Sequence, residues 1–249
     1  MGNSIKKAPI FIGGLENSGK TSFLCALIEV AKSRGREIAT FKPFDTGLLK
    51  RNAEEAPGDG ELFCRKMAGK PTEGLVSPYI AHETYPVEMA LRRDGITINE
   101  AFLRERIAVL SGRYRDLFIE LPPGLFTPVS EKKLAYEWML SFSDRIVWII
   151  HPIAGQLEHN LAEIDLLKRL QCQIHLVLNN ATKITDQDLL FFQWEKIESF
   201  AAQQIEGMTP FVEDLPNNGE TMKQKTIEAV PSLLNTLLGD CLPLIESKP

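Results

Sequence analysis

The sequence lacks the features that mark membrane, secreted and disulfide-bonded proteins. Among its 249 residues no apolar run reaches the ~18–20 residues that a membrane-spanning helix needs. The first seven residues contain no long apolar core of the kind a signal peptide carries. The cysteines are far apart and form no C-x-x-C pair, which favours reduced thiols over a disulfide framework or a zinc site: Cys25, Cys64, Cys172 and Cys241. We therefore expect a cytoplasmic protein that makes no use of a membrane.

Positive charge is also in short supply. The chain has 28 Lys and Arg against 33 Asp and Glu, a formal net charge of -5. This balance argues against a protein built mainly to hold nucleic acid, although a local pocket can still be positive and bind a small anion. The sequence offers no Ser-His or Cys-His arrangement for a covalent nucleophile. These absences favour a globular protein that acts on a small ligand rather than on nucleic acid.

The most informative stretch that is present is a glycine-rich loop at residues 13–21. Four of its residues fit the spacing G-x-x-x-x-G-K-[ST], namely Gly14, Gly19, Lys20 and Thr21. Before the loop, residues 9–12 read as a short buried strand, and after it residues 22–32 carry apolar side chains at helical spacing. A strand before and a helix after are the setting that this motif requires. The sequence therefore predicts a phosphate-binding loop.

The chemistry of such a loop follows from its geometry. Backbone N–H groups, among them those of Asn17, Ser18 and Ser22, surround phosphate oxygens, and the helix start adds its partial positive charge. The Lys20 ammonium is expected to reach the terminal phosphates, and the Thr21 hydroxyl to bind the metal ion that bridges them. We therefore expect a nucleotide with several phosphates and a divalent cation.

Predicted strands and helices alternate along nearly the whole chain. Strands are predicted at 9–12, 37–41, 117–119, 146–150 and 174–178 and around 211–212, and helices at 22–32, 60–69, 98–111, 157–170, after 185 and at 221–237. The helix at 98–111 is expected to begin with a capping box formed by Thr97 and Glu100. Short apolar strands separated by helices are typical of a parallel sheet that is covered on both faces. Because no change of composition marks a linker, we predict one α/β domain over residues 1–249, with a mostly parallel sheet of the P-loop NTPase type.

Polar residues follow several of the predicted strands at the point where each strand ends. Lys42, Glu120, His151 and Asn179 occupy these positions, as does the loop at 13–21. The carboxyl ends of parallel strands meet at one edge of a sheet, which is where ligands bind in such folds. We therefore expect these side chains to lie around one crevice.

With these residues in place, the chain resembles the dethiobiotin synthetases from about residue 8 to residue 215. The family's short motifs occur in the same order, as Lys42-Pro43-Phe44-Asp45-Thr46-Gly47, Ser77-Pro78-Tyr79, the loop Glu120–Pro128, Asn179 after Val177-Leu178, and the segment 210–214. Enzymes of this family use ATP, Mg²⁺ and CO₂ to close a cyclic urea on a diamine acid during biotin synthesis. The resemblance implies that reaction here.

The resemblance also implies roles for the charged residues. Lys20 and Lys42 are expected to stabilise the phosphoryl and carbamate oxygens. Thr21, Asp59 and Glu120 are expected to hold Mg²⁺, a hard cation that favours hydroxyl, carboxylate and phosphate oxygens. The position of Asp59 follows from counting back without a gap from the segment at 77–79.

Other residues are expected to contact the substrate and the base. By the same resemblance, Thr46 and Gly124 face the substrate, while Asn179 and Pro210 lie beside the adenine. Asparagine can also serve guanine, so the residue type alone leaves the base open. The family forms homodimers with the site at the interface, which implies a homodimer here.

Departures from the family pattern are concentrated on the substrate side. Glu16 stands within the phosphate loop, where its carboxylate repels phosphate unless it turns away or meets a cation. Leu121-Pro122-Pro123 replaces a small, flexible Gly-Ala-Gly, and two prolines remove two N–H donors. Glu158 replaces an asparagine at a helix start that receives the substrate carboxylate in the family, and it is expected to repel that group.

Two hypotheses therefore remain. In the first, the protein is a divergent dethiobiotin synthetase that recognises the same substrate with other donors. In the second, it is a P-loop protein of the same architecture with a different acceptor or none, acting as a nucleotide-controlled switch or partner-binding module. We favour the first because the metal ligands and both lysines are all present.

Overall fold

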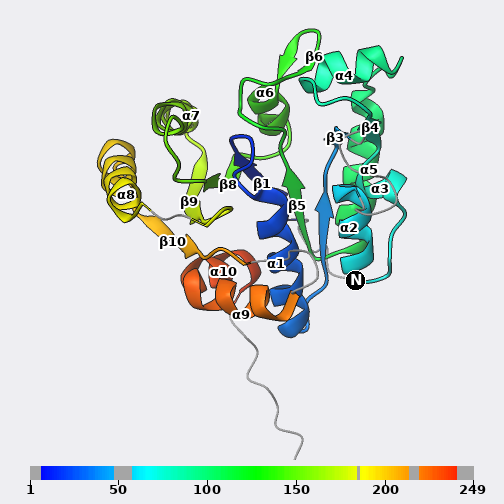
Figure 1. Cartoon of the computed structure of the whole chain (residues 1–249). Coiled ribbons are helices and arrows are strands. Elements are labelled where there is room, and N and C mark those ends of the chain that lie inside the picture. The colour runs from blue at the N-terminus through cyan, green and yellow to red at the C-terminus, as the bar shows by residue number, and fades with distance from the viewer. Residues whose placement is uncertain (1–6, 48–57, 184–185, 213–218, 240–249) are drawn as a thin grey trace, which may run out of the picture.

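A single sheet of six parallel strands forms the centre of the protein. The computed structural model describes residues 7–47, 58–183, 186–212 and 219–239. In these ranges the strand order is β10-β9-β8-β1-β5-β2, and every neighbouring pair is parallel (Figure 1). The strands are β1 (Ile10–Gly14), β2 (Ile38–Phe41), β5 (Asp116–Glu120), β8 (Arg145–Ile150), β9 (Gln173–Asn179) and β10 (Ile205–Thr209). The predicted parallel sheet is confirmed.

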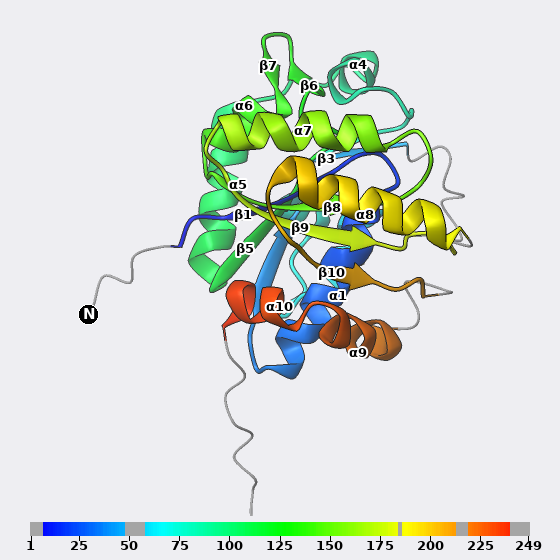
Figure 2. The ribbon, with the colours of Figure 1, turned by 90° about the vertical axis from the view of Figure 1, so that its left-hand side faces the viewer.

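Helices cover both faces of this sheet. On one face lie α1 (Lys20–Ser33), α9 (Gly219–Ala229) and α10 (Pro231–Leu238), and on the other lie α7 (Leu157–Arg169) and α8 (Gln187–Ala201) (Figure 2). A further helix, α5 (Glu100–Arg113), packs against β2 and β5. None of the helices in the described ranges is long and apolar enough to cross a membrane.

Shorter elements connect these layers. They are β3 (Phe44–Thr46), α2 (Asp59–Lys66), α3 (Glu73–Val76), β4 (Tyr79–Ala81), α4 (Val87–Arg93), β6 (Pro128–Ser130), β7 (Lys133–Leu134) and α6 (Ala135–Leu140). Strand β3 pairs in parallel with β4, and β6 pairs with β7 as an antiparallel hairpin. These short strands were not predicted, because each has only two or three residues and shows no alternation of apolar and polar residues.

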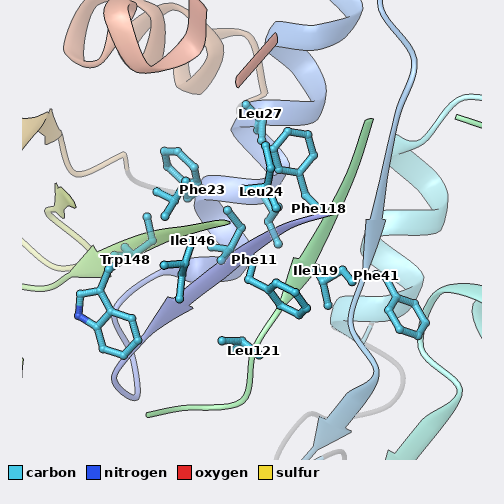
Figure 3. Close-up of a cluster of buried hydrophobic side chains, with 14 of the residues drawn as sticks. Phe11, Phe23, Leu24, Leu27, Phe41, Phe118, Ile119, Leu121, Ile146 and Trp148 are labelled. Atoms are coloured by element: carbon cyan, nitrogen blue, oxygen red, sulfur yellow. The ribbon is translucent and has the colours of Figure 1, made fainter. Parts of the chain in front are cut away.

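The apolar core lies between β1, β5, β8 and helix α1 (Figure 3). Phe11, Phe118 and Ile146 come from the three central strands, and Leu24 and Leu27 come from α1; all are fully buried. Strands buried on both faces need continuous apolar sequence, which explains the unbroken runs seen in β5 and β8. This packing holds the end of β1 rigidly, so the loop that follows begins from a fixed point.

Two predictions near the sheet and α5 were wrong. The last strand is Ile205–Thr209 rather than a strand around 211–212. Gly207 and a register shift between Ile205 and Met208 interrupt its apolar pattern, which hid it from the periodicity argument. Helix α5 begins at Glu100 with Asn99 as its cap, whose Oδ1 accepts a hydrogen bond from the Phe102 N–H at 3.2 Å. The expected cap, Thr97, therefore lies outside the helix.

Two predicted helices are shorter than expected. The helix predicted at 221–237 is divided in two, because Pro231 starts α10 and has no N–H with which to continue α9. The helix predicted at 60–69 ends at Lys66, because Met67 is extended with a ψ of 147°, and Gly69 and Lys70 follow with positive φ values of 72° and 40°. The domain bounds 1–249 stay a prediction, because the described ranges include neither end of the chain.

Candidate functional site

The glycine-rich loop joins β1 to α1, as predicted. Gly14, Asn17 and Gly19 have φ values of 154°, 57° and 84°, which bend the chain back toward the helix. A Cβ on Gly19 would lie 2.0 Å from Nδ2 of Asn179, so only glycine fits there. Because α1 begins at Lys20, its free N–H groups and partial positive charge face the loop. The loop therefore has the geometry of a phosphate cradle.

Asn179, at the end of β9, fastens this loop to the sheet. Its Nδ2 donates a hydrogen bond to the Ser18 carbonyl oxygen at 2.7 Å, and its Oδ1 accepts one from the Thr209 hydroxyl. These two bonds fix the orientation of the side-chain amide. Nδ1 of His151 donates to the Asn179 carbonyl oxygen at 3.1 Å, and Nε2 lies 3.0 Å from the Thr182 hydroxyl. Burial lowers the pKa of His151, so this ring is held neutral.

Four predicted site residues from separate segments meet beside the loop. The Lys42 ammonium donates to Oε1 of Glu120 at 2.9 Å and to Oδ2 of Asp59. The Thr21 hydroxyl oxygen lies 3.1 Å from both Glu120 carboxylate oxygens and 3.2 Å from Oδ2 of Asp59. Thr21 and Glu120 are 99 positions apart in the chain, so the fold alone brings this cluster together.

A fifth residue, the acidic Asp45, positions this cluster, and it was not among the predicted site residues. Asp45 is 1% exposed on β3, and its Oδ2 accepts hydrogen bonds from the N–H groups of Asp59 and Gly60 at 3.1 and 3.4 Å. These are the first N–H groups of α2, where a carboxylate is favourable. Its Oδ1 lies 3.9 Å from the Lys42 ammonium. The sequence signal for it was an aspartate inside the motif at 42–47, although only the structure shows that this aspartate is buried.

Burial and mutual charge shift the ionisation of these groups. Burial lowers the pKa of Lys20 to about 8, although the Glu120 carboxylate works against that shift. Burial also acts to lower the pKa of Lys42, but the carboxylates of Glu120, Asp59 and Asp45 outweigh it and the pKa is raised. Burial raises the pKa of Glu120 despite the nearby Lys42. Lys42 is therefore a fixed positive charge, whereas Lys20 holds its proton less firmly.

The oxygen donors in this cluster fit Mg²⁺. A hydroxyl and two carboxylates, from Thr21, Asp59 and Glu120, are the hard ligands that this ion prefers. Within the described ranges no three His, Cys, Asp or Glu side chains group so as to hold a metal ion. The set therefore suits an ion that takes its other ligands from phosphate oxygens and water, as Mg²⁺ does when it is bound with a nucleotide.

A pocket adjoins the loop on the side of α9. It lies between the first turn of α1, the ends of β9 and β10, and α9, and its lining is Ser22, Phe23, Asn179, Asn180, Ala181, Thr209, Pro210, Phe211, Val212, Met222, Lys225 and Thr226. Asn179 and Pro210 are the two residues expected beside the base. The three residues from α9 were not predicted, because only the packing of α9 on α1 brings them here. The pocket combines apolar walls with a few polar groups, as ligand sites do.

On the opposite side, the segment from Leu121 to Thr127 folds back over the start of the phosphate loop. The Leu121 N–H donates to the Ile12 carbonyl oxygen at 2.9 Å, and the Gly124 N–H donates to the Gly14 carbonyl oxygen at 3.1 Å. Leu121 and Pro122 are buried. The backbone N–H of Gly124, a residue expected to face the substrate, is thus bonded to the protein itself.

The remaining residues of the expected substrate side are partly buried or exposed. Thr46 ends β3 directly after Asp45 and is partly buried. Glu16 is exposed at the tip of the phosphate loop, so its carboxylate reaches solvent. Glu158 is exposed in the first turn of α7. Of the segment 210–214, residues 213 and 214 lie outside the described ranges.

The sequence is similar to several curated dethiobiotin synthetases. It is 24% identical over 212 residues to the ATP-dependent dethiobiotin synthetase BioD of Bacillus cereus, a match that covers 85% of this chain and 84% of the relative. The enzyme of the same name from Caldicellulosiruptor saccharolyticus is 23% identical, with 89% of this chain and 92% of the relative covered. That of Thermodesulfovibrio yellowstonii is 22% identical, with 91% and 100% covered. The resemblance drawn from the motifs is confirmed.

Solved structures of similar fold include two from Aquifex aeolicus. The MinC:MinD cell division protein complex matches with a TM-score of 0.52 and 18% identity, covering 95% of this chain and 98% of that chain. The MinD cell division protein matches with a TM-score of 0.52 and 14% identity, covering 96% and 99%. At these identities the likeness concerns the fold alone, and it agrees with the P-loop architecture described above.

A family model described as an AAA domain, AAA_26, matches residues 9–224, and the chain belongs to that family.

Proposed function

We propose that the protein is an ATP- and Mg²⁺-dependent ligase of the dethiobiotin synthetase type. The observation that carries this proposal is the cluster of Lys42, Asp59, Glu120 and Thr21 beside the phosphate loop. A loop that only binds a nucleotide has no need of a second, mostly buried lysine beside it. A lysine held between two carboxylates at this edge suits a site in which charge moves from a phosphate to an acceptor.

The proposed reaction has three steps. One amine of a diamine acid forms a bond to CO₂ and loses a proton, which gives a carbamate. A carbamate oxygen then bonds to the γ-phosphorus of ATP, and ADP leaves. The second amine attacks the carbamate carbon and loses a proton, the bond from that carbon to the phosphate oxygen breaks, and phosphate leaves a cyclic urea behind. The reaction consumes one diamine, one CO₂ and one ATP, and it yields one cyclic urea, ADP, phosphate and the protons lost by the two amines.

The protein contributes position and charge to these steps. The Lys20 and Lys42 ammonium groups stabilise the oxygens of the transferring phosphoryl group and of the carbamate. Thr21, Asp59 and Glu120 hold Mg²⁺, which neutralises charge on the β- and γ-phosphates when it is bound. The Asn179–Thr209 pair and Pro210 face the adenine, and Thr46 and Gly124 face the acceptor. No covalent enzyme intermediate is required.

A second candidate keeps the phosphoryl chemistry and changes the acceptor. It is favoured by Glu158, whose charge in the first turn of α7 opposes a carboxylate tail, and by the bonding of the Gly124 N–H to Gly14. A nucleotide-controlled switch is the limiting case, in which no acceptor exists. In that case ATP and ADP must change the assembly state or the affinity for a partner.

The decisive measurement is ADP release with ATP, Mg²⁺ and bicarbonate, with and without 7,8-diaminopelargonic acid. We expect the diamine to stimulate ADP release and a cyclic urea to accumulate in equal amount. ATP binding without stimulation would reject the diamine as substrate and favour the second candidate. Sedimentation with ATP, with ADP and without nucleotide then tests both the proposed cytoplasmic homodimer and the switch.

A further inference from the structure

A buried glutamate outside the phosphate loop contacts the segment that faces the acceptor. Glu163 lies on α7 and is 7% exposed. Its Oε2 accepts a hydrogen bond from the N–H of Leu125 at 3.1 Å, although the two residues are 38 positions apart. Burial raises the pKa of Glu163, while this hydrogen bond and the nearby His159 act in the other direction. Burial of a carboxyl group costs free energy unless the group has a hydrogen-bonding partner.

The second contact of Glu163 is with Gly124. This glycine has a φ of 75°, and a Cβ added to it would lie 3.2 Å from Oε1 of Glu163. The backbone at Gly124 is therefore held in a left-handed conformation directly against the carboxylate. Glu163 thus contacts two consecutive residues of the segment that follows Glu120.

Gly124 is in turn hydrogen-bonded to the phosphate loop. The Gly124 N–H donates to the Gly14 carbonyl oxygen at 3.1 Å, and the Lys20 ammonium donates to the same oxygen at 3.1 Å. The phosphate-loop end of the segment thus has its own bond to Gly14, and Glu163 holds the residues that follow.

We propose that Glu163 is a positioning residue that fixes the segment 121–127 over the phosphate loop and so sets where the acceptor approaches the γ-phosphate. This inference rests on the proposed function for its kinetic consequence, but the anchoring of the segment stands on contacts alone. A displacement of about 1 Å in such a segment is enough to change turnover by up to 10²-fold. Pro122 and Pro123 have no N–H groups with which to bond this segment to the protein. The hydrogen bond from the Leu125 N–H to Glu163 holds the residues that follow them.

The test compares Glu163→Ala with Glu163→Gln in the full-length protein. The glutamine keeps an oxygen that can accept from the Leu125 N–H, whereas the alanine does not. Asp165→Ala is the matched control, because Asp165 is on the same helix and its side chain is 58% exposed. Amide hydrogen exchange of the peptide covering 121–127 reports the anchor, and the KM values for ATP and for the diamine report its consequence.

We expect Glu163→Ala to speed exchange of the Leu125 amide at least 10-fold and to raise the KM for the diamine at least 10-fold. The KM for ATP should change less than 2-fold, and Glu163→Gln should restore both values. Unchanged exchange in Glu163→Ala would overturn the proposal, as would an equal rise in both KM values or a glutamine variant as impaired as alanine. If the diamine stimulates no turnover in the unaltered protein, the proposed function fails, while the exchange difference still decides whether Glu163 anchors the segment.

Discussion

The nucleotide side and the acceptor side of the site differ in the hydrogen-bonding partners of their polar groups. On the nucleotide side, the side chains of Lys42, Asp59, Glu120 and Thr21 contact one another and converge on the edge of the phosphate loop. On the acceptor side, the backbone N–H groups of the segment 121–127 are bonded to Ile12, Gly14 and Glu163. The nucleotide side thus presents charge to a ligand, whereas the acceptor side is shaped mainly by its own packing. Under the proposed function, phosphoryl transfer would fix the chemistry of the nucleotide side, whereas the acceptor side would be free to differ between substrates.

The largest effect is expected from Lys42→Ala. Loss of a fixed positive charge that acts on the transferring group should lower kcat about 10²–10³-fold while ATP binding remains. The carboxylates of Asp59 and Glu120 then lose their ammonium, so the free energy of unfolding should fall by about 3 kcal/mol. Steady-state kinetics and urea unfolding measure the two effects.

Lys32→Ala is the control for this comparison, because Lys32 is a half-exposed lysine of α1 paired only with Glu29 among the described contacts. It should change neither quantity by a measurable amount. Undiminished product formation by Lys42→Ala would remove the chemistry proposed for the nucleotide side.

Gly19→Ala should weaken ATP binding about 10- to 100-fold. The φ of 84° strains any side chain, at a cost of about 1–3 kcal/mol, and the new Cβ displaces Nδ2 of Asn179. Gly35→Ala is the matched variant, since Gly35 has a φ of 65° with nothing within 4 Å of its Cβ. Isothermal titration with ATP should show normal affinity for Gly35→Ala. Equal affinities in both variants would mean that Asn179 does not hold the loop.

On the acceptor side, Glu158→Asn should lower the KM for the diamine acid by up to about 5-fold. Removal of a negative charge from the first turn of α7 frees the helix start to attract the substrate carboxylate, an effect of about 0.3–1 kcal/mol. Asp165→Asn, in a later turn of the same helix, serves as control. An unchanged KM would place the substrate tail elsewhere or point to an acceptor without a carboxylate.

The smallest effect is a difference in pH dependence between the two sides. Burial lowers the folded-state pKa of His151 below its ordinary value of about 6.5, so its contribution to stability is present above that pH and is lost as the pH falls through the folded value. Burial raises the folded-state pKa of Glu163 above about 4.3, so its contribution is present below that pH and is lost as the pH rises through the folded value. Urea unfolding of His151→Gln and Glu163→Gln across pH 4–8 should therefore diverge from the unaltered protein in opposite directions. Parallel curves for all three proteins would show that neither group is linked to folding.

Part of the site was predictable because short, local sequence patterns mark its residues. The loop at 13–21 required only its glycine spacing and its flanking strand and helix, and Lys42, Glu120 and Asn179 required only the ends of apolar runs. The strand at Ile205–Thr209 was missed because Gly207 breaks its pattern, and the cap of α5 was misplaced because Asn99 competes with Thr97. Where two neighbouring residues can each cap a helix, only the packing around them decides which one does.

The sequence by itself determined the fold class, the phosphate loop and the order of polar strand ends, since these follow from the period of apolar residues and from the few residue types a phosphate cradle accepts. Only the tertiary structure decided that Asp45 caps α2, that residues of α9 line the pocket beside Asn179, and that Glu163 reaches Leu125. Each of these contacts joins segments that are distant in the chain. Distances between such segments depend on how helices pack on the sheet, and no local pattern of residues encodes them.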